Sequence, residues 1–64
     1  MVNEGDKIRL KTGEIAIISE VLEVGVAYIA EILKKGGGVS IEQISRDDIA
    51  SVFEEIERSL AKAI

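Results

Sequence analysis

The sequence predicts a mainly β fold, in which one small domain forms a five-stranded barrel. Eleven isoleucines and six valines make up 17 of the 64 residues, and their stiff, branched side chains suit a pleated sheet better than a helix. Residues 7–11 alternate strictly between polar and apolar side chains. Glycines separate the apolar runs, which is typical of strands joined by tight turns.

The first predicted strand covers residues 7–11. Its alternation places Ile8 and Leu10 on the buried side and three cations on the other side. Gly5 before it and Gly13 after it are turn signals, since glycine adopts a positive φ without steric cost.

Residues 14–35 allow two interpretations. As a hairpin, strands at 14–22 and 26–33 flank a turn at 23–25. As a helix, apolar residues recur at spacings of three and four: Ile15, Ile18, Leu22, Val26, Ile29 and Leu33. We prefer the hairpin, because a helix would hold Gly25 in its interior at a cost of about 1 kcal/mol relative to alanine. Because residues 14–22 carry apolar side chains at both odd and even positions, we expect this strand to be buried on both faces of the sheet.

The three glycines at 36–38 predict a flexible hairpin loop, and the alternation that follows predicts a short strand from Val39 toward Ile44. No strand–loop–helix context or Gly-Lys-Ser/Thr ending accompanies these glycines, so the loop is not a phosphate-binding motif.

Residues 45–48, Ser-Arg-Asp-Asp, have the composition of a helix N-terminus, with a capping serine and two aspartates in the first turn. Two alternatives stay open for residues 46–64. Either one helix runs from about residue 46 to the end, or a single 3₁₀ turn leads into a short strand at 50–54 and a helical or extended tail at 55–64.

The pattern of Gly-Asp, alternating strand, glycine and second strand, from Gly5 to Val21, resembles the opening hairpin of KOW-type and related SH3-like barrels. The segment from Glu42 to Phe53 resembles the end of such a barrel, where a 3₁₀ turn precedes the last strand. Together with residues 26–29, the chain resembles a family of small bacterial SH3-like proteins of unknown function. This resemblance implies an SH3-like barrel at about residues 5–54 within a single domain of residues 1–64, and it implies no activity.

A second resemblance is to the small RNA-binding carbon storage regulators, which share the chain length, the Val-Leu-Glu-Val stretch at 21–24 and a hairpin-rich chain that ends in a helix. That resemblance implies RNA binding through basic edges. In this chain the basic stripe consists of three residues, against twelve carboxylates: Lys7, Arg9 and Lys11.

The composition argues against catalysis. The chain has no histidine and no cysteine, which removes the usual general base and the commonest metal ligands. We therefore expect no enzyme activity, no cofactor and no metal. The net charge of −4 makes nucleic acid a poor expected partner. No apolar run is long enough to span a membrane, and the polar start is no signal peptide, so we expect a cytoplasmic protein without membrane contact.

Acidic side chains gather late in the sequence, at Asp47, Asp48, Glu54, Glu55 and Glu57. A hard cation needs six or more oxygens in a fixed arrangement, usually in a glycine-turned loop. Roles in helix capping and in solubility explain these carboxylates better than a cation site does.

Two sets of candidate site residues remain. The partner-binding hypothesis uses the two aromatic residues and a C-terminal apolar stripe: Tyr28, Phe53, Ile56, Leu60 and Ile64. We expect Phe53 to pack in the core and Tyr28 to lie on a partly exposed barrel face. The nucleic-acid alternative uses the basic stripe, whose cations lie about 7 Å apart on one strand face, although such a stripe is ordinarily a solvated face that protects an edge strand.

We therefore expect a small, non-catalytic protein-interaction module. Its partner is another protein or a second copy of the chain, bound through the C-terminal apolar stripe or by strand addition at a barrel edge. The alternative is a nucleic-acid-binding module, KOW-like or similar to the carbon storage regulators.

Overall fold

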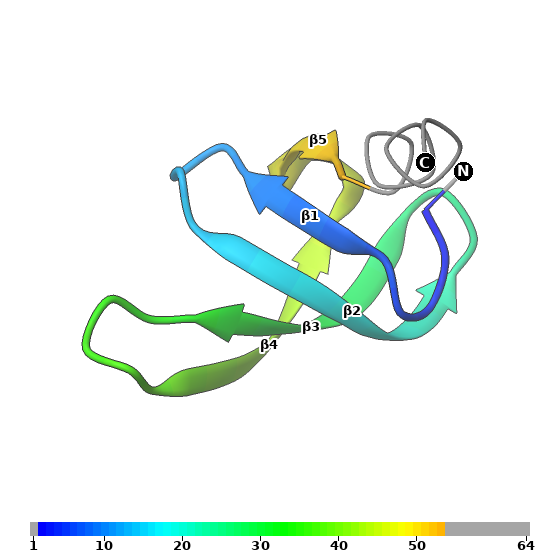
Figure 1. The fold of residues 1–64 in the computed structure, drawn as a ribbon. Helices are drawn as coiled ribbons and strands as arrows, with labels where there is room; N and C mark the ends of the chain where they lie inside the picture. Colours follow the sequence, from blue (N-terminus) through cyan, green and yellow to red (C-terminus); the bar gives the residue numbers. More distant parts are fainter. Residues whose placement is uncertain (1, 54–64) are drawn as a thin grey trace, which may run out of the picture.

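The computed structural model describes residues 2–53, whose strands form one antiparallel sheet. The elements follow in the order β1 (Lys7–Leu10), β2 (Ile15–Glu23), β3 (Ala27–Leu33), β4 (Val39–Ser45), the 3₁₀ turn η1 (Arg46–Asp48) and β5 (Ile49–Val52) (Figure 1). The strand order in the sheet is β4-β3-β2-β1-β5. The mainly β prediction is therefore confirmed, and the last strand returns to pair with the first.

The hairpin interpretation of residues 14–35 is confirmed, and the helical one is wrong. β2 and β3 pair along their length and are joined by a turn in which the Val26 amide donates to the Glu23 carbonyl at 3.0 Å. Gly25 has a φ of 74° there, a left-handed conformation that a branched residue adopts only with strain. The apolar residues at helical spacing are instead distributed over both faces of the sheet.

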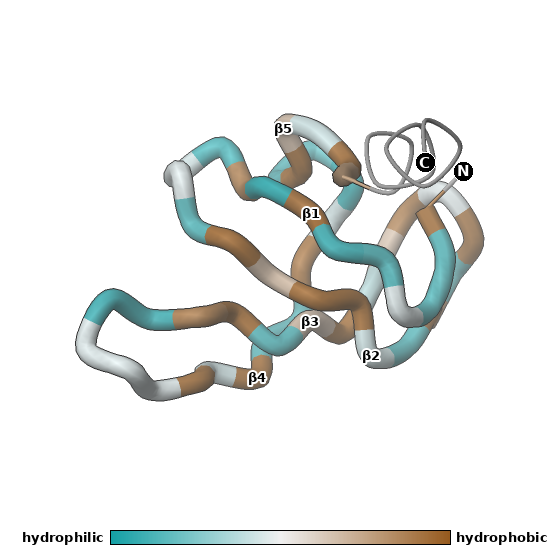
Figure 2. Tube along the Cα trace, viewed as in Figure 1, coloured by the Kyte–Doolittle hydropathy of each residue, from teal (hydrophilic) through white to brown (hydrophobic). Residues whose placement is uncertain are grey.

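The core lies on one face of the sheet, which we call the inner face. Its buried apolar side chains are Ile8, Leu10, Ala16, Ile18, Tyr28, Ala30, Ile32 and Ile44. Large and small side chains lie opposite one another, since Ala16 is between Ile8 and Ile32 in the register and Ala30 is opposite Ile18. Figure 2 shows the hydrophobic positions as brown segments along the central strands β2 and β3.

A β-bulge at Ser19 changes which residues of β2 face the core. Ile18 pairs with Ala30, but the next pair is Glu20 with Ile29, so Ser19 is an extra residue on β2. Its hydroxyl donates to the Ile29 carbonyl at 3.2 Å. Because an extra residue shifts the alternation by one, even-numbered residues face inward before the bulge and Val21 packs against the core after it.

The turn η1 sets the path from β4 to β5. The Ser45 amide donates to Asp48 Oδ2 at 2.9 Å, and the Arg46 amide donates to the Val26 carbonyl at 2.9 Å. The Asp48 carbonyl then accepts from the Lys11 amide at 2.9 Å, which brings the chain to the end of β1. The second alternative for residues 46–53, a 3₁₀ turn followed by a strand, is therefore the observed one.

The sheet curls, and in Figure 1 the end of β4 passes behind β2 and β1 toward β5. Within residues 2–53 these two strands are the edges of the sheet and do not pair with each other. The last strand pairs with β1 through Ile8 opposite Val52 and Leu10 opposite Ile49. The predicted tail at 55–64 lies outside the described residues.

Two adjacent isoleucines on β2 test which face is buried. Ile18 is 1% exposed and Ile17 is 37% exposed. We expect Ile18→Val to lower the free energy of unfolding by about 0.5–1.5 kcal/mol, because it removes a methylene from a packed core. Ile17→Val is the matched control and should change it by less than about 0.5 kcal/mol. Urea denaturation of both variants measures the difference, and equal losses would contradict the assignment of faces.

Candidate functional site

The outer face of the sheet, opposite the core, carries two rows of side chains across four strands. Directly paired residues of antiparallel strands point to the same face, so the register defines each row. The first row is Lys7, Ile17, Glu31 and Ile41, and the second row is Arg9, Ile15, Leu33 and Val39. Each row therefore begins with a cation on β1 and ends with an aliphatic side chain on β4.

Four exposed side chains in these rows form what we call the apolar patch: Ile17, Leu33, Val39 and Ile41. Their exposed fractions are 37% for Ile17 on β2, 43% for Leu33 on β3, and 54% and 70% for Val39 and Ile41 on β4. Apolar exposure thus rises toward the edge strand. The expectation that residues 14–22 are buried on both faces is wrong, because Ile17 on the outer face is 37% exposed.

Phe53 lies beside the two cations of β1. Its amide donates to the Lys7 carbonyl at 2.9 Å, which holds the residue just beyond β5. The ring centroid is 5.6 Å from Lys7 Nζ and 5.4 Å from Arg9 Cζ, within the roughly 6 Å over which an aromatic face attracts a cation. The ring is partly buried and outside the core cluster, so the expected core packing of Phe53 is wrong.

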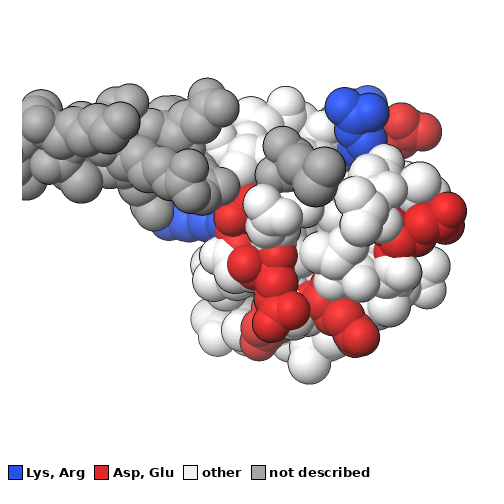
Figure 3. Space-filling model, turned by 90° about the vertical axis from the view of Figure 1, so that its right-hand side faces the viewer, with Lys and Arg blue, Asp and Glu red and all other residues white. Residues whose placement is uncertain are grey.

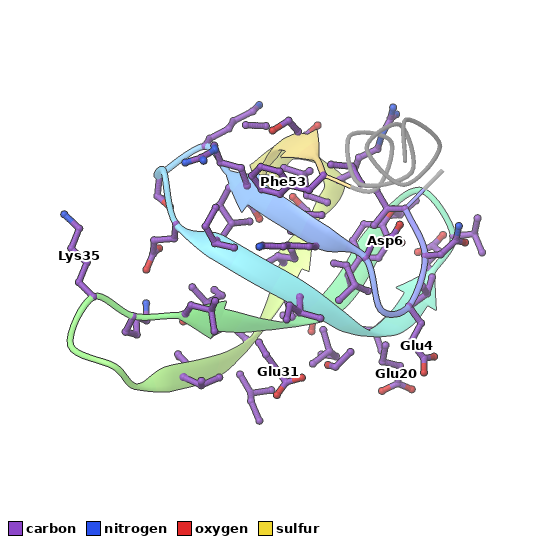
Figure 4. All side chains as sticks on the ribbon, in the orientation of Figure 1. Glu4, Asp6, Glu20, Glu31, Lys35 and Phe53 are labelled. Carbon is purple, nitrogen blue, oxygen red and sulfur yellow. The ribbon has the colours of Figure 1, made fainter. Side chains whose placement is uncertain are left out.

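An open groove of about 750 Å³ adjoins this ring, and we call it the basic groove. It is lined by Lys7, Arg9, Thr12, Gly13, Glu14, Ile15, Leu33, Lys34, Lys35 and Phe53. The lining holds four cations and one carboxylate, with aliphatic side chains between them. Figure 4 shows its two sides, with Phe53 near β1 and Lys35 at the loop between β3 and β4. The basic groove and the apolar patch share Leu33.

The single carboxylate of the groove is paired. Lys34 Nζ donates to Glu14 Oε2 at 2.9 Å and lies 3.8 Å from Glu42 Oε2. This hydrogen bond holds the pKa of Glu14 below its ordinary value, and the Thr12 hydroxyl lowers that pKa further. The same hydrogen bond raises the pKa of Lys34.

Carboxylates gather at the other end of the molecule. Figure 3 shows several groups of acidic side chains in this view, set among uncharged ones. Figure 4 places Glu4 and Glu20 close together there, and the Gly5 amide donates to the Ile18 carbonyl at 2.7 Å, which joins the two segments. Four of the described cations therefore line the basic groove, whereas Glu4 and Glu20 lie at the other end of the molecule.

The residues chosen from the sequence fall into three groups. Lys7, Arg9 and Phe53 come together at the basic groove. Lys11 follows the end of β1, is exposed, and is not part of the groove lining. Tyr28 is 1% exposed, so the expectation that it lies on a partly exposed face is wrong. It sits on the inner face between Val21 and Ile44.

The C-terminal apolar stripe, Ile56, Leu60 and Ile64, lies outside the described residues, as do Glu54, Glu55 and Glu57. Asp47 and Asp48 belong to η1, where Asp48 caps the turn. Residues 2–53 contain no group of three or more acidic side chains placed to hold a metal ion.

Sequence reasoning missed the apolar patch and the contribution of Lys34 and Lys35. The sequence did show apolar residues at both odd and even positions of β2, but this pattern was interpreted as burial of both faces of the strand. A sequence pattern does not distinguish a covered apolar face from an uncovered one. The sequence pattern does not place the two lysines near β1. Their position follows from the register, in which Ile15 lies between Arg9 and Leu33, the residue before Lys34.

No protein-family model matches this chain, and neither a curated protein nor a solved structure matches it. Within the described part of the chain, no helix is long and apolar enough to cross a membrane.

The Glu14–Lys34 pair predicts a pH dependence with a definite sign. The lowered pKa of Glu14 stabilises the fold above the carboxyl's unfolded-state pKa, and this contribution is lost as the pH falls through the folded-state value. The raised pKa of Lys34 stabilises the fold below the ammonium's unfolded-state pKa, and this contribution is lost as the pH rises through the folded-state value.

We expect Lys34→Met to raise the pKa of Glu14 part of the way to its ordinary value, because the Thr12 hydroxyl still donates to the carboxylate. Titration of the side-chain carboxyl carbons by NMR measures this shift. Lys35→Met removes a neighbouring cation but keeps the hydrogen bond between Lys34 and Glu14, so the pKa of Glu14 should change little. Equal effects of the two variants would contradict the assignment.

Proposed function

We propose that the chain is a small, non-catalytic protein-interaction module built on an SH3-like barrel. The barrel is supported by the return of β5 to β1 and by the 3₁₀ turn before β5. Both features agree with the family that the sequence resembles. The bend of β2 at Ser19 lets one long strand pair with β1 at its start and with β3 along its length.

The apolar patch is the observation that carries the interaction role. Its four side chains lie on three neighbouring strands around Leu33, with Glu31 between Ile17 and Ile41 in the register, and each is more than one-third exposed. Small soluble domains seldom leave a contiguous apolar surface uncovered unless another molecule covers it. The patch adjoins the basic groove, so a partner receives apolar contact at the centre and charge contact at one side.

The described titratable groups with shifted pKa values form a surface ion pair. Such a pair suits a structural role, because catalytic acids and bases have pKa values shifted by burial in a cleft. The chain also lacks histidine and cysteine. These features support binding rather than chemistry.

Self-association is the form of interaction that we propose, through the apolar patch together with the C-terminal stripe at Ile56, Leu60 and Ile64. Burial of one leucine or isoleucine side chain contributes about 1.5–3 kcal/mol, so a few such residues supply enough free energy for a weak dimer after association costs.

Sedimentation analysis of the full chain tests this function. We expect the wild type to associate with rising concentration, and Leu33→Asp to weaken association by about tenfold or more, because a charge replaces a buried apolar contact. Val24→Asp replaces another exposed aliphatic side chain by the same charge, in the turn between β2 and β3 and outside both the patch and the groove lining, and is the matched control. Leu60→Asp reports on the stripe separately. A wild type that stays monomeric at every concentration would refute self-association.

Nucleic acid binding is a second candidate, favoured by one observation. Phe53 lies against Lys7 and Arg9 in a groove that also contains two further lysines, and single-stranded nucleic acids bind grooves that combine cations with an aromatic stacking surface.

For this candidate, we expect single-stranded RNA to bind with an affinity that falls as salt is added. Three or four phosphate contacts would give a slope of roughly −2 to −3 in log affinity against log salt. Phe53→Leu should weaken binding by removing the stacking surface, while Lys11→Ala, outside the groove, should have little effect. An affinity that does not depend on salt would exclude this function.

A further inference from the structure

We propose that two copies of the chain pair antiparallel along β4, with Ile41 on the two-fold axis, so that their two sheets become one. This inference rests on the proposed self-association and names the surface and the partner.

Within residues 2–53, β4 is an edge strand that lacks the usual protection against a further strand. Natural edge strands are usually short, irregular, or guarded by lysine or proline. β4 has seven residues, contains neither lysine nor proline, and pairs with β3 at seven consecutive positions without a register shift. The other edge within the described residues, β5, has four residues and a register shift against β1. The two edges therefore differ, and β4 is the one suited to a further strand.

The hydrogen bonds at both ends of the β3–β4 ladder show which backbone groups of β4 are unpaired. The Lys34 amide donates to the Gly38 carbonyl at 2.8 Å, and the Arg46 amide donates to the Val26 carbonyl at 2.9 Å. Hydrogen-bonded pairs alternate along an antiparallel ladder. The even-numbered residues of β4 therefore direct their amides and carbonyls at β3, and the odd-numbered residues direct theirs outward.

A two-fold pairing centred on Ile41 uses these outward groups. It places Ile41 opposite the second copy's Ile41 and Val39 opposite the second copy's Gln43, all with outward-directed amides and carbonyls. An isologous contact requires such self-complementarity. Ser40 then lies opposite the second copy's Glu42, and within each copy the Ser40 hydroxyl donates to Glu42 Oε2 at 2.7 Å.

The two neighbouring registers are less favourable. Centring the axis on Ser40 would pair only residues 39–41 of β4, because Glu42 would then lie opposite Gly38, outside the strand. Centring the axis on Glu42 would place two carboxylates directly opposite each other, and like charges in that position are destabilising. The Ile41-centred register avoids this repulsion. It also joins the two apolar patches across the axis, because Val39 and Ile41 are on the same face as Leu33 and Ile17. The most exposed residue of the patch, Ile41 at 70%, becomes its centre.

Hydrogen exchange of the full chain provides the first test. We expect the amides of Ile41 and Gln43 to become protected as the protein concentration rises, while the amides of Ser40 and Glu42 are protected at every concentration. Association that leaves Ile41 and Gln43 unprotected would overturn the proposal. That result would still allow self-association through another surface.

Two variants measured by sedimentation provide the second test. Gln43→Pro removes an outward amide and leaves the ladder to β3 intact, so it should abolish dimerisation with the fold retained by circular dichroism. Gln43→Thr keeps the amide and is the matched control. Ile41→Lys places two cations at the axis and should raise the dissociation constant by more than about tenfold.

Added salt separates this interface from the basic groove. Each copy carries a net charge of −4, so screening should strengthen dimerisation, whereas it weakens binding of RNA. A mass that is unchanged in Gln43→Pro and Ile41→Lys, but reduced in Leu60→Asp, would refute the β4 pairing and keep the proposed function. A wild type that remains monomeric would refute both.

Discussion

The structure depends on a single sheet that buries one of its own faces. No disulfide is available, because the chain has no cysteine, so apolar packing must hold the described part of the chain together. The bulge at Ser19 makes this possible, since it bends β2 and returns Val21 to the core side. The alanines at 16 and 30 leave room for larger neighbours. Because side chains alternate between the two faces of a strand, the choice of residues for the inner face also decides which side chains lie on the outer face, including its exposed aliphatic ones.

Local patterns predicted the elements well. The alternation in β1, the glycine between β2 and β3, and the capping residues Ser45 and Asp48 act over a few residues, so they can be recognised without the fold. The helical spacing in residues 15–33 was a coincidence, because it mixes buried Ile18 with exposed Leu22 and Val26. Strand identity was therefore predictable from residue type and turn signals.

What could not be predicted depends on register and curvature. The bulge at Ser19 has no distinctive local signal, and it decides that Val21 packs against the core. Tyr28 faces the core because it alternates with Ala30 and Ile32 on β3. The grouping of Lys34 and Lys35 with Lys7 and Arg9 requires the loop between β3 and β4 to lie near β1. Phe53 joins them only because β5 returns to the first strand. The sequence therefore predicted only part of the candidate site. The alternation in β1 identified Lys7 and Arg9, whereas the other members come from segments distant in the sequence.

The pairing of β5 with β1 has a consequence for how the molecule assembles. The other strand pairs in the described sheet join neighbours along the chain, so they can form through short-range closure, whereas this pair links the two ends of the described segment. Contacts between such distant segments form at a larger entropic cost than local hairpins. Phe53 reaches the cations of β1 only after that step. Occupancy of the groove and docking of β5 are therefore thermodynamically linked, and any ligand held there would also lower the population of molecules in which β5 is locally detached.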